Sequence, residues 1–438
     1  MTERDPQWNE GGGGGVEPLL TVTDAAAASE PPATASARSS SCCREILSAI
    51  QNLTSALTPR SPLFAAFHDG QVHDPLGAGS YAFQTDILGP VLSALVHDER
   101  LSSGKSLADI TSNENGENII HAGLQPNNSP HAGTIVVFCY AFAIARGIRD
   151  RIKAAAAVSV EITFIDTAPV KEQGVELGGV QYQRSYRDVP LALQTNMADY
   201  DEVLHLLSTW SSIPFTVSFQ ANLFSHPTIP SILGYIIRHH ELLGHQLSPK
   251  YGTLAIRAAC PAPGCCLAEK HGRHNVYKPA AAAAVQDATI TFRCPVHGPH
   301  TISISEPADV ARLEANAPIR NLIRSMSHLL DTDAHHIRVT GADYAGMYQE
   351  VFLYRPLATW SAVTGLAAGR TPHILYAPLI TDWSGAKLSK SLYIRERGYH
   401  VMELLGTDGL CSFAQLKRRF GSDGGATGLR RIWDEVEG

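Results

Sequence analysis

The alternation of apolar and polar positions between residues 117 and 166 predicts a strand, a helix and a second strand, in that order. An apolar run begins at Glu117 and breaks at Pro126, and residues 135–155 carry apolar side chains at the spacing of a long buried helix. The stretch from Ala157 to Asp166 is rich in β-branched side chains, which is typical of a strand. Because a strand–helix–strand unit forms a right-handed crossover, we predict an α/β protein with a mostly parallel sheet.

The pattern also predicts elements on both sides of this unit. They are helices at 42–59 and 83–96, an extended stretch at 211–224, helices at 228–247, 307–330 and 346–357, and strands at 336–341 and 373–380. Ligands of parallel sheets bind beyond the carboxyl ends of the strands. We therefore expect the loop from Gln125 to His131 and the side chain of Asp166 to lie at one cavity.

Changes in composition divide the chain into five expected segments. A run of five glycines and a run of four alanines mark residues 1–41 as a disordered low-complexity tail. The other segments are a first half of the catalytic domain at 42–250, an inserted zinc-binding module at 251–305, a second half at 306–400, and a short basic C-terminal helical tail at 401–438.

Composition and charge narrow the class of protein. The chain has 438 residues, of which 44% are apolar and 18% charged, so a fibrous or wholly disordered protein is excluded. A net charge of -7 gives no overall attraction to nucleic acid, and we expect no DNA partner; a tRNA would need a local basic surface. Residues 387–431 supply one, with nine basic and four acidic side chains, unless these residues form only a solvated basic helix. We expect no membrane span and no secretory signal, and a cytoplasmic location.

Two turns rich in proline and glycine carry the candidate metal ligands. The first is Cys260-Pro-Ala-Pro-Gly-Cys265-Cys266 and the second is Cys294-Pro-Val-His297. Four soft ligands in two pairs are typical of tetrahedral structural zinc, so we predict Cys260, Cys265, Cys294 and His297 as ligands, with Cys266 as an alternative to Cys265. Buried free cysteines beside a surface histidine are the other interpretation.

Two further stretches are typical of anion binding. Pro130-His131-Ala132-Gly133-Thr134 starts a helix after a strand, which presents backbone N–H groups and the positive end of a helix dipole; a plain connection capped by Ser129 is the alternative. In Lys387-Leu-Ser389-Lys390-Ser391, two lysines with interleaved hydroxyls can clamp a polyphosphate, although a solvated loop fits the same letters.

Together these stretches resemble class I aminoacyl-tRNA synthetases. Residues 130–134 are similar to the His-Ile-Gly-His signature, with Thr134 in place of the second histidine, and residues 387–391 to the Lys-Met-Ser-Lys-Ser loop. The zinc-like insertion and Gly341-Ala-Asp343-Tyr after Arg338 resemble the lysyl and arginyl branches. The resemblance implies a Rossmann-like catalytic domain of class I synthetase type with an inserted zinc-ribbon-like module, in which Lys387, Ser389, Lys390 and Ser391 bind phosphate or the tRNA end.

A narrower resemblance is to the tRNA-dependent cyclodipeptide synthases. Residues 123–129 are similar to their Gly-Val-Ser-Pro-x-Asn-Ser stretch, with Gln125 in place of the acylated serine, and the fungal arginine-containing branch is the nearest fit. It implies a transferase that joins two aminoacyl groups taken from aminoacyl-tRNAs, arginine among them, into a diketopiperazine of secondary metabolism.

Peptide-bond formation from aminoacyl esters requires a proton carrier and donors to an oxyanion. The candidates are Ser129, His131 and the backbone amides of Gly133 and Thr134, and the candidate substrate-binding residues are Gln125, Asn128, Asp166, Glu172, Gly341 and Asp343. The carboxylates among them can equally be helix caps or surface acids. Two alternatives stay open: an ATP-dependent aminoacyl-tRNA ligase, which would use ATP as cosubstrate, and a non-catalytic tRNA-binding protein.

Overall fold

The computed structural model describes residues 64–66, 80–81, 88–89, 92, 117–152, 157–170, 173–189, 191–280, 288–331, 333–364, 373–381, 387, 412–420, 423 and 425–437. The expected N-terminal tail, the helix at 42–59 and most of the helix at 83–96 lie outside these residues. Glu172, Ser389, Lys390 and Ser391 also lie outside them.

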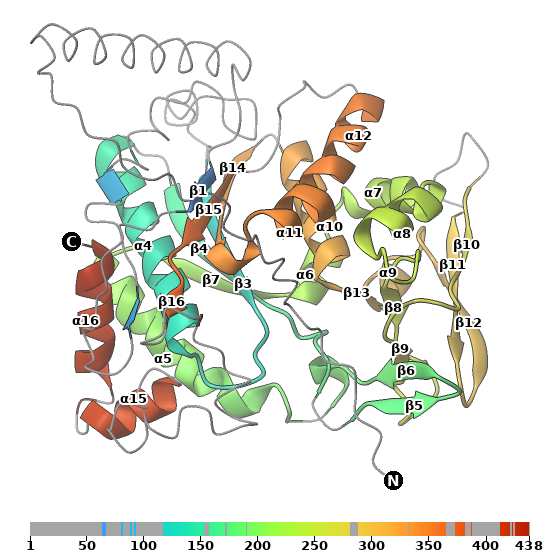
Figure 1. Cartoon of the computed structure of the whole chain (residues 1–438), viewed down its shortest axis with the longest axis horizontal. Helices are drawn as coiled ribbons and strands as arrows, with labels where there is room; N and C mark the ends of the chain where they lie inside the picture. The colour runs from blue at the N-terminus through green and yellow to red at the C-terminus, as the bar shows by residue number, and fades with distance from the viewer. Residues whose placement is uncertain are drawn as a thin grey trace, which may run out of the picture. The chain divides into compact units, whose positions relative to one another are not determined.

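A six-stranded sheet forms the centre of the molecule (Figure 1). Its order is β1 (Phe64–Ala66), β15 (His373–Ala377), β14 (Ala334–Gly341), β3 (Glu117–Leu124), β4 (Ala157–Phe164) and β7 (Phe215–Phe219). Every neighbouring pair is parallel, which confirms the predicted fold class. The chain builds outward from β3 through β4 to β7 and, later, outward from β14 in the opposite direction. The order therefore reverses between β3 and β14, the point where parallel sheets open a crevice for ligands.

One face of the sheet is covered by α4 (Ala132–Ile152), α5 (Gln194–Ser211) and α16 (Ala426–Glu437), with α15 (Phe413–Phe420) beside them (Figure 1). Helix α4 is long and apolar enough to cross a membrane by length and composition. Its apolar residues are instead buried against the sheet and α16, where Leu429, Ile432 and Trp433 complete the same core. The last helix of the expected basic tail is thus part of the main core.

The opposite face carries a second helical layer (Figure 1). It consists of α6 (Gln220–Phe224), α7 (Ile229–Arg238), α8 (His240–Leu247), α10 (Ala317–Leu330), α11 (Met347–Gln349), a π-helical stretch at Glu350–Tyr354 and α12 (Arg355–Thr364). Strand β15 shows how the two layers share the sheet, because Leu375 and Ala377 enter the first core while Ile374 and Tyr376 enter the second. Helices α4 and α10 therefore lie on opposite faces.

The inserted segment forms small sheets of its own. Strands β10 (Val276–Lys278), β11 (Thr289–Cys294) and β12 (Gly298–Ser303) form an antiparallel sheet. Strand β9 (Ala268–Glu269) extends a hairpin of β5 (Val175–Leu177) and β6 (Val180–Gln183). Strand β8 (Ile256–Ala258) pairs with β13 (Leu313–Ala315), which follows α9 (Pro307–Val310). The single helix expected at 307–330 is therefore interrupted: α9 and α10 (Ala317–Leu330) are helical as predicted, and the strand β13 separates them and closes the insertion. Strands β2 (Ser80–Tyr81) and β16 (Ile380–Thr381) form a separate pair.

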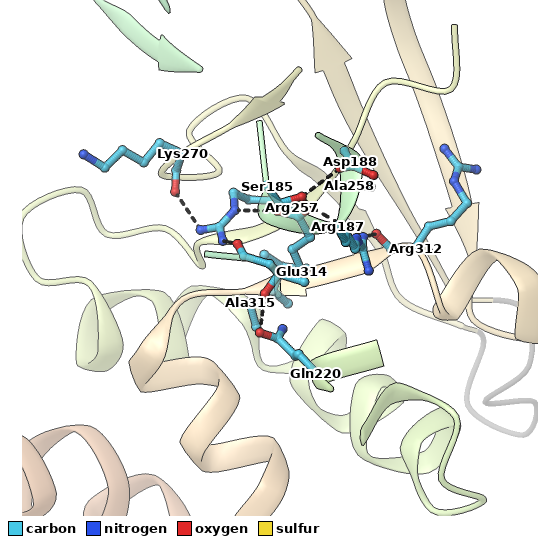
Figure 2. Close-up of polar contacts among 12 residues, drawn as sticks. Ser185, Arg187, Asp188, Gln220, Arg257, Ala258, Lys270, Arg312, Glu314 and Ala315 are labelled. Atoms are coloured by element: carbon cyan, nitrogen blue, oxygen red, sulfur yellow. Dashed lines mark hydrogen bonds and ion pairs between the residues drawn. The ribbon is translucent and has the colours of Figure 1, made fainter. Parts of the chain in front are cut away.

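A buried carboxylate holds the base of this insertion (Figure 2). Glu314 of β13 is 1% exposed and its carboxylate accepts hydrogen bonds from Ser185 Oγ at 2.7 Å and from Arg257 Nε at 3.2 Å. Arg187, in the short 3₁₀ turn Tyr186–Asp188, places its Nη2 3.4 Å from the same carboxylate. The clamp joins β8, β13 and the segment after β6, three pieces that are far apart in sequence.

Candidate active site and metal cluster

A cavity of about 480 Å³ lies at the carboxyl edge of the sheet, where β3 and β14 end. One side of it is formed by the loop after β3 and by the start of α4, and another by α10. The end of β14 with the 3₁₀ turn Ala342–Tyr344, and the segment after β15, complete the lining. The cavity thus lies beyond the carboxyl ends of the strands, where the strand order reverses between β3 and β14.

The start of α4 places an imidazole in this cavity. His131 precedes α4, and its Nε2 lies 3.4 Å from Thr134 Oγ1. Gly133 leaves room for the ring, because a β-carbon at this position would lie 2.9 Å from His131 Cε1. The Thr134 backbone N–H donates to His131 O at 2.9 Å and is therefore engaged within the helix, which removes it from the expected pair of oxyanion donors.

The structure brings seven of the predicted site residues to the cavity: Gln125, His131, Gly133, Thr134, Gly341, Asp343 and Lys387. They come from three separate parts of the chain. Lys387 also forms an ion pair with Asp343. The lysine of the predicted phosphate-binding loop therefore contacts the 3₁₀ turn that follows β14.

Three predicted site residues do not line the cavity. Ser129 Oγ accepts a hydrogen bond from the Ala414 N–H at 3.1 Å at the start of α15, and Asn128 O accepts one from Tyr200 Oη at 2.8 Å. Asp166 is buried and its Oδ1 accepts from the Gln220 N–H at 3.1 Å at the start of α6. Burial raises the pKa of Asp166, and the nearby Arg187 opposes the shift. Ser129 and Asp166 therefore cap the N-termini of α15 and α6 and do not contribute to the cavity.

Three arginines that the sequence analysis did not identify as site residues line the cavity. Arg320 and Arg324 lie one turn apart on α10, and Arg338 lies on β14. Arg320 is 8% exposed and Arg324 is 6% exposed. Burial lowers the pKa of Arg320 to about 10 and that of Arg324 to about 9. The sequence did contain a signal: Arg320 and Arg324 stand at positions of α10 where the helical spacing predicts apolar core residues. Arginine is rarely buried without a partner, so such positions indicate a candidate binding site.

Cys260, Cys265, Cys294 and His297 converge, with one ligand atom of each within 4.8 Å of the others. Cys260 Sγ lies 3.4 Å and Cys294 Sγ 3.6 Å from His297 Nδ1, and Cys265 Sγ lies 3.7 Å from Cys294 Sγ. Ligands of a tetrahedral zinc lie about 3.8 Å apart for two sulfurs and about 3.6 Å for sulfur and nitrogen, given the usual metal distances. This Cys3His cluster could therefore hold a metal ion.

The electrostatics of the cluster favour a thiolate. Burial raises the pKa of the Cys294 thiol, but the backbone N–H groups of Val296 and His297 and the His297 side chain outweigh it and lower the pKa to about 7. Cys266 follows Cys265 with a φ of 51° and is not part of the cluster. Of the two cysteines left open by the sequence, the geometry selects Cys265.

A second group of convergent side chains consists of His121, His328 and His336. His121 Nε2 lies 2.8 Å from His336 Nδ1, and His336 Nε2 lies 2.9 Å from Asp331 Oδ2. The rings of His328 and His336 stack at 4.1 Å with 10° between their planes, so their in-plane lone pairs do not converge on one point. We interpret this histidine cluster as a hydrogen-bonded part of the core.

Acid should destabilise the protein through this cluster. Burial lowers the pKa of His121 and of His328 well below 6.5, and the neighbouring His336 lowers both further. Below pH 6.5 the unfolded chain takes up protons that the folded chain does not, so each histidine removes about 1.4 kcal/mol of stability per pH unit. The pair should cost about 3 kcal/mol between pH 7.5 and 5.5. The free energy of unfolding of His328→Gln, measured by denaturant titration at several pH values, should fall less steeply with acid, by the contribution of one histidine. An unchanged dependence on pH would contradict this.

The cavity, the parallel sheet and the Cys3His cluster define an α/β protein with a cavity at its switch point and a candidate metal site in an insertion. No protein-family model matches the chain, and no curated protein matches it. Among solved structures, the glutamate-tRNA synthetase from Elizabethkingia anophelis aligns with 11% identity over 64% of this chain and 54% of its own, at a TM-score of 0.26. A glutamate tRNA ligase from Elizabethkingia meningosepticum, in complex with its amino acid, aligns with 9% identity over 59% and 49%, at a TM-score of 0.22. The chain spans about half the length of these structures, and a likeness this weak carries no argument about function.

Proposed function

We propose that the chain is a tRNA-dependent aminoacyltransferase whose cavity receives the aminoacylated adenosine end of a tRNA. The observation that carries the proposal is the presence of His131, the α4 start and the Lys387–Asp343 pair around one cavity. A volume of about 480 Å³ is in the range of small-ligand sites and suits an aminoacyl-adenosine. The resemblance of residues 123–129 to the cyclodipeptide synthases favours a cyclic dipeptide as the product.

In the proposed reaction, the amine of one aminoacyl group attacks the ester carbonyl of the other. A carbon–nitrogen bond forms, the carbon–oxygen bond to the ribose breaks, and the tRNA hydroxyl leaves with a proton. His131 is positioned to take the proton from the ammonium group and to return it to the leaving hydroxyl. The free amine of the dipeptidyl ester then attacks the remaining ester carbonyl. A second carbon–nitrogen bond closes the ring, the carbon–oxygen bond to the second ribose breaks, and the second tRNA hydroxyl leaves with the proton of the amine.

The second candidate is an ATP-dependent aminoacyl-tRNA ligase. It is favoured by the cluster of arginines and Lys387 in the cavity, since such groups also bind the phosphates of ATP. Thr134 stands where the class I signature has its second histidine, which favours the transferase.

The expected tRNA surface near the C-terminus is smaller than the sequence suggests. Lys417 Nζ lies 2.8 Å from Asp199 and 2.9 Å from Glu202, and Arg430 Nε lies 2.7 Å from Asp434. Carboxylates therefore already neutralise part of this basic segment, and we assign the main tRNA contact to the cavity end.

We also propose that the Cys3His cluster binds zinc with a structural role. Four protein ligands fill a tetrahedral site and leave no position for a water or a substrate.

The proposed function is tested with purified full-length chain and a mixture of preformed aminoacyl-tRNAs. Cyclic dipeptides should appear by mass spectrometry without ATP. Amino-acid-dependent exchange of pyrophosphate into ATP would instead identify the ligase, and absence of both activities would leave a binding protein.

Replacing His131 with Asn should lower the rate of product formation by about 10²- to 10³-fold, because general acid–base catalysis is lost. Gly133→Ala should also lower it, since the new β-carbon would displace the imidazole. His205→Asn is the matched control, because this histidine is exposed on α5, where its Nδ1 lies 2.7 Å from Asp201 O and its ring packs edge-on against Phe215. Equal rates for His131→Asn and His205→Asn would remove His131 from the mechanism.

A further inference from the structure

The guanidinium groups of Arg320, Arg324 and Arg338 form an arginine wall on one side of the cavity. Arg320 Nε, Arg324 Nη2 and Arg338 Nη1 are buried and have no hydrogen-bond partner in the described part of the chain. Among the described residues, one hydrogen bond joins this wall to a backbone oxygen, from Arg320 Nη1 to Ala315 O at 3.2 Å. A buried charged donor without a partner is costly, so the wall is built for a group that the protein itself does not supply.

No described carboxylate forms an ion pair with the arginine wall. Glu161 acts on Arg324 from a distance, but its carboxylate accepts from Ser218 Oγ at 2.6 Å and lies 3.5 Å from His121 Nδ1. Tyr348 lies near Arg338, and burial raises the pKa of this phenol to about 12, so it is neutral at physiological pH. Within the described part of the chain, the positive charge of the wall therefore faces the cavity without an ion-pair partner, since Asp343 is paired with Lys387.

The two sides of the cavity differ in chemistry. His131 and the α4 start come from one face of the sheet, and Arg320 and Arg324 come from α10 on the opposite face. Gly123 at the end of β3 lies between them, and a β-carbon there would come within 3.5 Å of Arg324 Nη1. A ligand that contacts both sides must cross the sheet edge, with one end at the imidazole and the other at the arginines.

We infer that the arginine wall binds the side-chain carboxylate of an acidic aminoacyl group, aspartyl or glutamyl, so that the cavity selects an acidic substrate. This inference rests on the proposed function in one respect, which is that the ligand is the aminoacylated end of a tRNA.

Charge complementarity decides between substrate classes. A carboxylate accepts paired hydrogen bonds from guanidinium groups and supplies the missing negative charge. The guanidinium of an arginyl substrate would instead face three like charges. The cavity therefore disfavours the arginine specificity that the sequence resemblance implies, and a neutral amide would leave part of the buried charge unpaired.

The test compares two stable analogues of the tRNA end, 3′-glutamylamino-3′-deoxyadenosine and its glutaminyl counterpart, which have the same shape and differ in charge. Calorimetry with the full chain should show the glutamyl analogue binding at least about 100-fold more tightly. In Arg324→Met the ratio should fall to within about 3-fold, because the carboxylate loses its buried partner. Arg238→Met is the matched control, since Arg238 is exposed at the end of α7 and should keep the full ratio.

The outcomes separate this inference from the proposed function. If both analogues bind equally to the unaltered chain, the acidic specificity is wrong while the tRNA-end site stands. If neither binds, but free L-glutamate binds far better than L-glutamine and depends on Arg324, the arginine wall stands and the transferase proposal fails. If inorganic phosphate displaces the glutamyl analogue from the unaltered chain and has no effect on Arg324→Met, the wall is a phosphate site and the inference is wrong.

The melting temperature of Arg324→Met is a second test, because loss of an arginine that only supports the fold would lower it. Because Arg324 is buried and unpaired, Arg324→Met should leave the melting temperature unchanged or raise it, as at other sites where function opposes stability. A marked fall in melting temperature would assign Arg324 to the support of the fold and overturn its role in substrate selection.

Discussion

Removal of the metal from the Cys3His cluster is expected to lower the melting temperature by on the order of 10 °C and to expose the turns at 259–267 and 294–298 to proteolysis. The reason is the small local core: Val180, Tyr182 and Leu267 are its buried apolar residues besides the three cysteines. With so little apolar area, the metal must supply most of the local stability. Strands β11 and β12 should persist, since Ile290, Phe292 and Ile302 belong to the larger second core.

The adjacent cysteines provide a matched pair for this experiment. Cys265→Ser should reduce the zinc content measured by mass spectrometry and lower the melting temperature as chelation does, whereas Cys266→Ser should retain one zinc per chain. An equal loss of zinc in both variants would mean that the ligand choice made from the geometry is incorrect. Unchanged melting after complete removal of metal would eliminate the structural zinc.

The central sheet could be predicted because its elements carry local signals. Strand β3 breaks at Pro126, α4 starts after Pro130, and β4 is rich in β-branched residues, so pattern, turn chemistry and topology all agree. The strand β13 was missed because its three residues, directly before the Asn316 cap of α10, carry too little pattern to distinguish a strand from a helical turn. Its pairing with β8 is a contact across the insertion, which no local window contains.

The candidate site was only partly predictable for the same reason. His131 and Lys387 stand in short motifs, and both reach the cavity. Ser129 also stands in a motif, but its hydroxyl is used by the start of α15, a contact over 285 residues of sequence. Arg320 and Arg324 lie one turn apart on α10, but Arg338 comes from β14, so the meeting of all three at one cavity is a tertiary arrangement that no local pattern shows. Long-range packing therefore decides which polar residues line the cavity and which cap helices.

Replacing Glu314 with Ala should lower the free energy of unfolding by about 3–5 kcal/mol, because it leaves buried cations without their carboxylate. Arg257 is 6% exposed and would lose its only carboxylate among the described residues, while Ser185 and Arg187 would lose an acceptor. These contacts join the base of the insertion to the segment after β6 (Figure 2). Denaturant unfolding followed by circular dichroism measures the change.

The exposed ion pair of Arg430 and Asp434 on α16 is the matched control for Glu314→Ala. Its side chains are 48% and 55% exposed, so Asp434→Ala should cost no more than about 0.5 kcal/mol. The variant Glu314→Gln keeps the size of the side chain and should fall between the two, since the amide oxygen still accepts one hydrogen bond while the charge is lost. If Glu314→Ala and Asp434→Ala cost the same, the clamp contributes no more than a surface ion pair. The pairing of β8 with β13 would then have to hold the insertion closed alone, and variants in the apolar residues of these strands should show the larger loss.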